Sequence, residues 1–395
     1  MGLFLLSSAL VSAQSVTSVS FTSDSLSLNG SFYLPAGQGP FPAVVLVHGS
    51  GPNDRYQTLP LNSGNAQCLY PGLYPGTVKN FEDIAIGLQD SGIAVFTYDK
   101  RTFTHGSTLD AQKIVIEDFI RDGSAALNYL ASRTEVDTSL LYIVGHSQGA
   151  TLAPYIALQN THADGIISLA GPAIPLDTIL PDQVRYIYRN CADSTQGEQI
   201  AQQFYQAFQS IRAGTWPANQ ALSGAYAPFW LSWLQKTDSV VDAFQRAGLP
   251  YHFVQGSDDF NVPVENANRF GKALNLAAED LAIYPGINHY LTTASNINVS
   301  QAIIDTMVYW IKKAPRVGLV EAADPNYYYY TKNGRLFVET DDDAEVFQLR
   351  LYSLDGREIY NTSFKGRQSW ALPRPGIYIG RLENDRYSLP LKIQW

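Results

Sequence analysis

The chain contains little cysteine and no cluster of positive charge. Its 27 Lys and Arg residues are outnumbered by 36 Asp and Glu residues, which gives a formal net charge of −9. Affinity for nucleic acid comes largely from clustered cations that neutralise phosphates, so this pattern argues against a nucleic-acid partner. The chain also has no internal run of about 18 apolar residues, which argues against a transmembrane segment.

The only two cysteines are Cys68 and Cys191. Neither lies in a metal-ligand spacing, and we expect neither a metal nor an organic cofactor. An even number of cysteines in an exported chain permits one disulfide, while two separate buried thiols are an equally good interpretation.

Apolar residues, in contrast, are abundant. They make up 45% of the 395 residues, and this content predicts a packed core rather than disorder. The length exceeds what one core usually supports, so we expect one large domain and a small companion.

The chain begins with the segment "MGLFLLSSALVSAQS". An apolar stretch from Leu3 to Val11 is followed by a small-x-small pattern that ends at Ala13, which predicts a signal peptide over residues 1–13. The segment lacks the usual Lys or Arg, and a buried N-terminal strand is the alternative. A signal peptide would make the protein secreted or exposed at the cell surface.

Segments rich in Val, Ile and Leu alternate with amphipathic ones over residues 14–313. This alternation predicts an α/β domain with a mostly parallel sheet and helices on both faces. The expected strands are 25–34, 43–47, 93–98, 140–144, 165–169, 251–255 and 281–284. The expected helices are 81–89, 114–132, 147–159, 264–276 and 300–313.

Residues 172–247 interrupt this alternation because they hold helical stretches but no strand pattern. A connection of this length is more plausibly a helical cap than a loop. We expect the cap to cover the carboxyl ends of the strands, where ligands bind in this architecture. Its aromatic residues Phe229, Trp230 and Trp233 are candidates for an apolar substrate pocket, with core packing of the cap as the alternative.

The pattern changes again after residue 313. Residues 314–332 lack periodicity and are interpreted as a linker, and residues 333–395 predict a small all-β sandwich. Asp355-Gly356 between alternating segments indicates a hairpin. The acidic "DDDAE" at 341–345 is interpreted as a solvated turn rather than a metal site.

The segment "LYIVGHSQGAT" contains a Gly-x-Ser-x-Gly pattern at residues 145–149. An apolar strand precedes it and a helix follows it, which is the setting of a nucleophilic serine on a sharp turn. Gly145 and Gly149 leave room for this turn, and Ser147 is the candidate nucleophile. A simple helix N-cap is the alternative role for Ser147.

A serine hydroxyl needs a base to remove its proton and an acid to orient that base. Of the six histidines, His289 follows the last expected strand of the domain and is the candidate base. The acid should lie between serine and histidine in chain order. We favour Asp259 over Asp258, and Asp177 is a weaker alternative.

An oxyanion hole needs backbone N–H groups where negative charge develops. The N–H of Gln148 follows the nucleophile at the start of a helix. The loop "HGSGPNDR" after the "AVVLVHG" strand supplies the second donor, which we assign to Ser50, with Gly51 as the weaker candidate. A phosphate-binding loop is the other interpretation of these glycines, but no Gly-Lys-Ser/Thr follows.

Together, "HGSGPNDR", "FEDIAIGLQDSGIAVFTYDKRT", "GHSQGA", "QGSDDFNVP" and "NH" resemble the α/β-hydrolase superfamily, in particular its dienelactone-hydrolase-like and prolyl-oligopeptidase-like serine esterases. The resemblance implies a Ser147–Asp259–His289 triad, a serine carboxylesterase and an ester substrate. A serine peptidase is the alternative enzyme, and a non-catalytic surface binding protein is the alternative outside catalysis. In "YDKR", the resemblance implies a structural Asp99, while Lys100 and Arg101 are candidates for a substrate role.

The C-terminal segments "FQLRLYSLDGREIYN", "LPRPGIYIGRL" and "LPLKIQW" are similar to the sorting domain of the bacterial type IX secretion system. This similarity covers about residues 333–395. It implies export across both membranes and a partner in the secretion machinery.

Overall fold

The computed structural model describes residues 13–62, 64–313, 327–332, 335–340, 346–353, 356–373, 377–384 and 388–394. The segments 1–12, 314–326 and 341–345 lie outside the described residues, as does Asp355. The expected signal peptide, most of the expected linker, the acidic turn and half of the expected hairpin turn fall there. The chain divides into two compact units, Met1–Lys312 and Lys313–Trp395.

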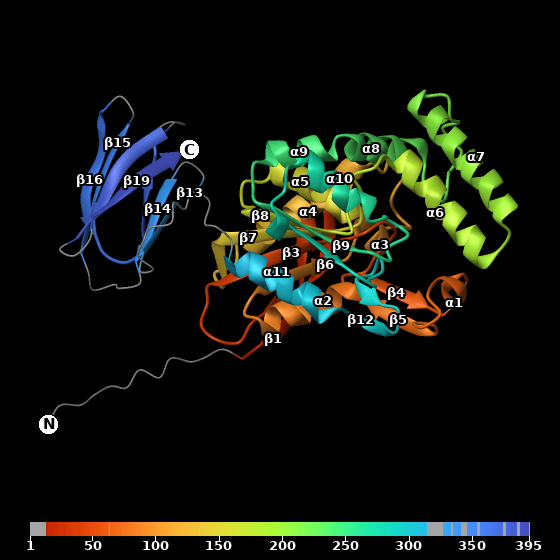
Figure 1. The fold of residues 1–395 in the computed structure, drawn as a ribbon, viewed down its shortest axis with the longest axis horizontal. Helices are drawn as coiled ribbons and strands as arrows, with labels where there is room; N and C mark the ends of the chain where they lie inside the picture. Colours follow the sequence, from red (N-terminus) through yellow and green to blue (C-terminus); the bar gives the residue numbers. More distant parts are fainter. Residues whose placement is uncertain are drawn as a thin grey trace. The chain divides into compact units, whose positions relative to one another are not determined.

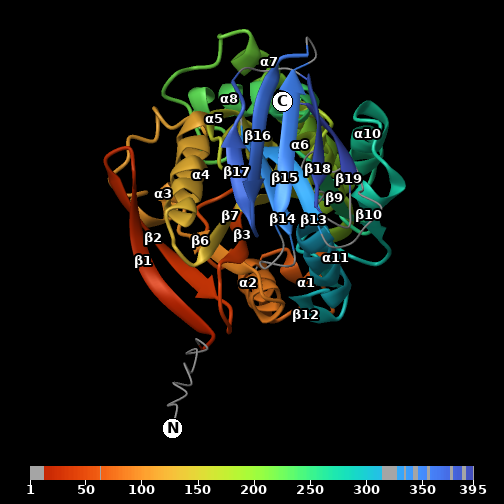
Figure 2. The same ribbon diagram turned by 90° about the vertical axis from the view of Figure 1, so that its left-hand side faces the viewer.

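The first unit is built on an eight-stranded sheet of order β1-β2-β6-β3-β7-β8-β9-β10. β1 is antiparallel to β2 and β2 to β6, and every pair from β6 to β10 is parallel. β1 and β10 form opposite edges of this sheet (Figure 2). The strands are β1 Ser15–Ser23, β2 Leu26–Leu34, β3 Phe41–Val47, β6 Ala94–Tyr98, β7 Val136–His146, β8 Gly165–Leu169, β9 Tyr251–Gly256 and β10 Leu281–Tyr284.

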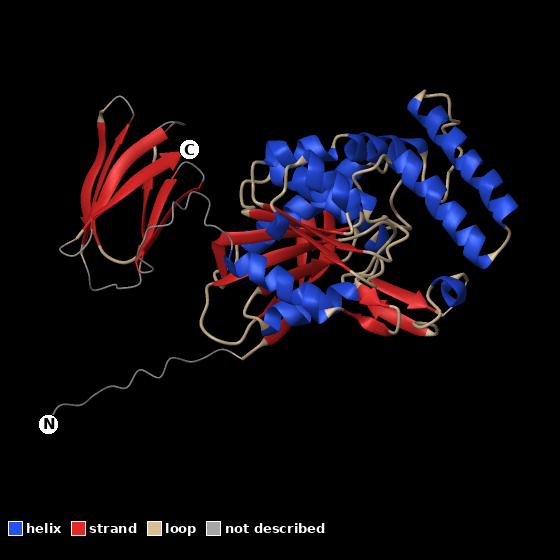
Figure 3. Cartoon of the chain, viewed as in Figure 1, coloured by secondary structure: helices blue, strands red, loops and turns tan. Residues whose placement is uncertain are grey.

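Helices cover both faces of the sheet (Figures 1 and 3). α2 and α11 lie on one face, and α4, α5 and α10 lie on the other. This arrangement confirms the predicted fold class. No described helix is both long and apolar enough to cross a membrane. The helices are α2 Asn80–Asp90, α3 Arg101–Thr104, α4 Ile116–Ala131, α5 Gln148–Gln159, α10 Glu265–Ala273, α11 Gln301–Lys313 and the 3-10 helix η1 Ala278–Asp280.

The apolar spacing of α4 explains why this segment is a helix on the sheet. Ile116, Ile120, Leu127 and Leu130 are fully buried and recur at helical spacing on one side. At its start, the Asp118 carboxylate accepts a hydrogen bond from the Val115 N–H at 2.8 Å. α4 therefore buries an apolar stripe against β3 and β7 and holds the sheet from one face.

Between β8 and β9 the described chain forms four helices and no strand, as expected for residues 172–247. α6 and α7 pair as a helical hairpin, and α8 packs against both of them (Figure 1). The helices are α6 Leu176–Cys191, α7 Ser194–Arg212, α8 Ala227–Asp238 and α9 Val240–Ala247.

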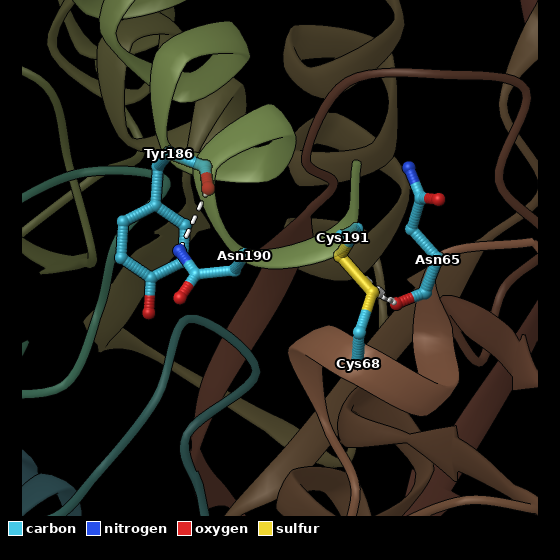
Figure 4. Close-up of a disulfide and its surroundings, with 5 residues drawn as sticks. All are labelled: Asn65, Cys68, Tyr186, Asn190 and Cys191. Atoms are coloured by element: carbon cyan, nitrogen blue, oxygen red, sulfur yellow. Dashed lines mark hydrogen bonds between the residues drawn. A yellow bond between two sulfur atoms is a disulfide. The ribbon is translucent and has the colours of Figure 1, made fainter. Parts of the chain in front are cut away.

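A second insertion follows β3 and was not expected to contain strands. It consists of a hairpin of β4 (Thr58–Leu61) and β5 (Gly76–Lys79) with the short α1 (Ala66–Leu69) between them. A disulfide joins Cys68 of α1 to Cys191 at the end of α6 (Figure 4). The structure thus contains one disulfide rather than two separate thiols, and this disulfide links the insertion covalently to the cap.

The second unit consists of two antiparallel sheets, of order β13-β14-β17 and β16-β15-β18-β19. Leu336 and Val338 from one sheet share a buried cluster with Leu349 and Leu351 from the other. The unit is therefore a small β-sandwich, as predicted. Its strands are β13 Tyr327–Lys332, β14 Arg335–Thr340, β15 Phe347–Ser353, β16 Glu358–Phe364, β17 Gln368–Ala371, β18 Ile377–Glu383 and β19 Ser388–Gln394.

Candidate active site

Ser147 lies on the turn between β7 and α5. Its φ of 54° and ψ of −114° are a strained conformation for a residue with a side chain. A Cβ on Gly145 would lie 2.3 Å from the Gly149 carbonyl oxygen, and a Cβ on Gly149 would lie 2.0 Å from the Val47 carbonyl oxygen. Both positions therefore require glycine, and the turn presents Ser147 at the carboxyl end of the sheet.

His289 and Asp259 form a hydrogen-bonded pair. His289 follows β10 and Asp259 follows β9, and His289 Nδ1 lies 2.8 Å from Asp259 Oδ2. The buried carboxylate also accepts hydrogen bonds from the Val262 N–H at 2.8 Å and from Gln255 Nε2 at 2.9 Å. These donors fix the carboxylate, which in turn fixes the imidazole ring and favours a proton on Nδ1.

Ser147 and His289 line one cavity of about 130 Å³. Gly49 and Ser50 form part of its wall, and Asp259 lies behind His289. The remaining lining residues, mostly polar, are Asn53, Gln57, Leu59, His146, Asn261 and Tyr290. The structure thus brings three of the predicted residues, Ser147, His289 and Ser50, to one cavity.

Of the two expected oxyanion donors, Ser50 lines this cavity and Gln148 follows Ser147 directly in the chain. Ser50 follows β3, and Gln148 is the first residue of α5, where the positive end of the helix dipole favours an anion. No other described residue accepts a hydrogen bond from either backbone N–H. Both donors remain available for an oxygen that develops negative charge.

A buried network that the sequence analysis missed joins these segments. Gln57 accepts a hydrogen bond from the Gly49 N–H at 2.7 Å and donates to His146 Nδ1 at 2.8 Å. His146 Nε2 then donates to the His289 carbonyl at 2.8 Å. Burial, with His289 beside it, lowers the pKa of His146 to about 3, so this ring is neutral and links the loop after β3 to His289.

Lys100 is a second residue whose position the sequence did not reveal. It is only 4% exposed, and its ammonium donates to the Gly49 carbonyl at 2.6 Å and to Gln148 Oε1 at 2.8 Å. Arg101, in contrast, pairs with Asp122 at 2.7 Å, away from these groups. Neither side chain lines the cavity at Ser147, so the structure gives neither one a substrate contact there.

The other histidines and the alternative acids have different partners. His48 packs between Phe81 and Tyr98, and His252 stacks on Trp310. His105 contacts the Ser27 carbonyl, and His162 is exposed. Asp177 pairs with Arg212 in the cap, and Asp258 is exposed and accepts a hydrogen bond from the Ser257 hydroxyl.

The cap aromatics do not reach this cavity. Trp230 and Trp233 are each 6% exposed and stack on one another with ring centroids 5.7 Å apart. Phe229 packs edge-on against both rings. Trp230 and Trp233 belong to the main hydrophobic core and Phe229 packs against it, so the structure favours core packing over a place in the wall of the substrate pocket.

A metal centre is not found in the part of the chain that the structure describes. No group of three or more His, Cys, Asp or Glu side chains there has the arrangement to hold an ion.

The chain is similar to a family model and to a curated relative. Residues 74–295 match the family model described as Hydrolase_4: Serine aminopeptidase, S33. Esterase EstD from Thermotoga maritima is 31% identical over 300 residues, which cover 72% of this chain and 66% of EstD. The chain thus spans just under two thirds of the length of this relative.

Two solved structures illustrate the similarity at lower identity. Est1E from Butyrivibrio proteoclasticus has 14% identity and a TM-score of 0.47, and the match covers 75% of this chain and 98% of Est1E. The α/β hydrolase GrgF from Penicillium sp. sh18 has 16% identity and a TM-score of 0.48, over 76% of this chain and 98% of GrgF.

Proposed function

Since the chain belongs to the α/β-hydrolase family described as serine aminopeptidase S33, we propose that it is a serine carboxylesterase that acts through Ser147, His289 and Asp259. The observation that carries the proposal is the 2.8 Å hydrogen bond between Asp259 and His289 beside a cavity that Ser147 also lines. The name of the relative EstD, an esterase, supports ester cleavage.

In the first half of the proposed reaction, His289 Nε2 accepts the Ser147 hydroxyl proton. Ser147 Oγ attacks the ester carbonyl, and the Ser50 and Gln148 N–H groups bind the resulting oxyanion. Asp259 stabilises the imidazolium that forms. His289 then gives its proton to the leaving alcohol, and the acyl group stays on Ser147.

In the second half, water replaces the alcohol. His289 accepts a proton from water, whose oxygen attacks the acyl-enzyme carbonyl through a second oxyanion. Collapse of this intermediate breaks the bond to Ser147 Oγ, which recovers a proton from His289. The carboxylic acid leaves, and the enzyme returns to its starting state.

The small, mostly polar cavity favours short acyl groups. A volume of about 130 Å³ accommodates few acyl carbons, and Leu59 is the one aliphatic side chain of its wall. We therefore expect p-nitrophenyl acetate and butyrate to be cleaved with a higher kcat/KM than the palmitate ester. The proposal fails if no ester from acetate to palmitate is hydrolysed faster by the wild type than by Ser147→Ala.

A peptidase is the second candidate, because the description of the matching family names a serine aminopeptidase. The same groups can cleave an amide, since the acyl-enzyme route is shared. An amino-acyl p-nitroanilide measured beside the ester panel separates the two functions. Faster cleavage of the anilide than of every ester would replace the esterase proposal with the peptidase.

We also propose that the protein is exported and reaches the cell surface or the medium through the type IX secretion machinery. The Cys68–Cys191 disulfide supports an oxidising compartment, where such bridges persist. The similarity of residues 333–395 to the sorting domain supports the route. Intact-mass measurement of protein from envelope and medium tests it. An active periplasmic enzyme that retains this segment would contradict it.

A further inference from the structure

Lys100 stands out because its buried ammonium contacts both segments that carry the proposed oxyanion donors. Nζ lies 2.6 Å from the carbonyl oxygen of Gly49 and 2.8 Å from the side-chain oxygen of Gln148. It also lies 4.8 Å from the centre of the Phe119 ring. A single side chain thus connects the loop after β3 with the first residue of α5.

The contact with Gly49 bears directly on Ser50. The Gly49 carbonyl and the Ser50 N–H belong to the same planar peptide unit, so a donor that fixes the oxygen also fixes the direction of the N–H. A hydrogen-bond donor at this oxygen also polarises the peptide and strengthens its N–H as a donor. The Asn53 side chain makes a second hydrogen bond to the same oxygen at 3.0 Å.

The contact with Gln148 acts on the second donor. The Gln148 backbone N–H is the proposed donor, and its side chain is 1% exposed and held by Lys100. Because the side chain cannot move into solvent, the first turn of α5 keeps its place relative to the loop after β3. Both donors then keep a fixed separation.

The environment of Lys100 differs from that of an ordinary structural cation. Arg101, the next residue, is paired with the carboxylates of Asp122 and Asp118. No ion pair joins Lys100 to a carboxylate in the described part of the chain, and its partners are neutral oxygens. A buried cation without a directly paired carboxylate is costly, and burial lowers the pKa of Lys100 to about 7, against a smaller opposing effect of the Asp122 charge. Such a cost is typical of functional sites.

We propose that Lys100 is a positioning residue of the oxyanion hole, which orients the Ser50 and Gln148 N–H groups through the Gly49 carbonyl and the Gln148 side chain. The inference rests on the proposed function. It assigns Lys100 no contact with substrate, and its effect is on the transition state, where the oxyanion exists, rather than on substrate binding.

The test compares Lys100→Met and Lys100→Gln with the wild type on p-nitrophenyl acetate. Rates are expressed per active site titrated with a fluorophosphonate, so that unfolded protein is not counted. Lys113→Met is the matched control, because Lys113 has a highly exposed side chain and does not line the cavity. Inhibition by a trifluoromethyl ketone, which forms an oxyanion on the serine, reports on the hole itself.

We expect kcat of Lys100→Met to fall about 10- to 100-fold, below the loss of an oxyanion donor itself, with KM within about twofold. The inhibition constant of the ketone should rise in parallel with the fall in kcat. Lys100→Gln should recover part of the rate, because an amide can still donate to the Gly49 carbonyl. Should Lys100→Met not fold, Lys100→Gln is expected to show a smaller loss of the same kind.

A kcat per titrated site within about threefold of the wild type in the folded variants would overturn the inference. So would a rise in KM without a change in kcat or in ketone inhibition. In both results an active, labelled wild type leaves the proposed function standing. A wild type that neither reacts with the fluorophosphonate nor cleaves the ester would instead reject the proposed function, and the inference with it.

Discussion

The wall of the Ser147 cavity and the aromatic cluster of the cap both contain buried side chains, yet these side chains differ in polarity. Around Ser147 the structure buries polar groups, and one of them, the Asp259 carboxylate, is held by three donors. The cap buries Trp230 and Trp233 against one another. Burying polar groups costs free energy that packing does not recover, so the first region points to chemistry and the second to stability.

The largest effect is expected in the polar region around Ser147, for a substitution of Asp259. Asp259→Asn should reduce kcat by about 10⁴-fold, equivalent to about 5 kcal/mol. The amide can donate to His289 Nδ1, which places the imidazole proton on Nε2, where it cannot accept the Ser147 proton. Steady-state kinetics on p-nitrophenyl acetate measure the effect. A loss below tenfold would exclude Asp259 as the acid of the triad.

Trp233→Ala tests the role of the aromatic cluster of the cap. Removing a buried Trp leaves a large cavity, so we expect the free energy of unfolding to fall by about 3–5 kcal/mol. Urea denaturation measures this loss, and kcat of the folded protein should stay within about twofold of the wild type. A large rise in KM for short esters with unchanged stability would instead assign Trp233 to the substrate pocket.

His146 should contribute to acid sensitivity. Burial lowers its pKa to about 3, while in the unfolded chain it is near 6.5. The unfolded state therefore binds more protons between these values, and the free energy of unfolding falls as the pH drops from about 6.5 to 3.

At the acid end of that range, the protonation of His146 has lowered the free energy of unfolding by on the order of 4 kcal/mol. His146→Gln should flatten this part of the stability curve relative to the wild type. Burial also lowers the pKa of His48, which has the same sign, so only the difference between the two proteins is diagnostic. Curves that remain parallel from pH 6.5 to 4 would contradict the assignment.

The smallest effect is expected for Asp258→Asn. Asp258 is the neighbour of Asp259 but is exposed, and its partner is the Ser257 hydroxyl. We expect kcat within about twofold of the wild type and stability within about 0.5 kcal/mol. If Asp258→Asn lost as much activity as Asp259→Asn, the two carboxylates would not differ in role.

The sequence predicted which strands the candidate catalytic residues follow, but it did not predict the contacts that support these residues. Ser147, Asp259 and His289 each follow a strand, so local patterns were sufficient to select them as candidates. Lys100 and Gly49 are 51 positions apart, and Gln57 and His146 are 89 apart. Such contacts depend on which strands are neighbours, and no local pattern encodes that.

Local sequence patterns were also insufficient for two further parts of the molecule, β1 and the cap aromatics. β1 has mostly exposed residues because it is an edge strand, so its apolar content gave little signal. In the cap, an aromatic residue has the same identity whether it faces a pocket or the core. The sequence therefore allowed both roles for Phe229, Trp230 and Trp233, and only the packing separated them.

The central claim is that Ser147 accepts the acyl group. The most direct test is to react the protein with a fluorophosphonate, digest it, and locate the adduct by mass spectrometry. We expect one adduct, on the peptide that contains Ser147, and none in Ser147→Ala. An adduct on any other residue of the wild type, or no adduct with an otherwise folded protein, would contradict the account.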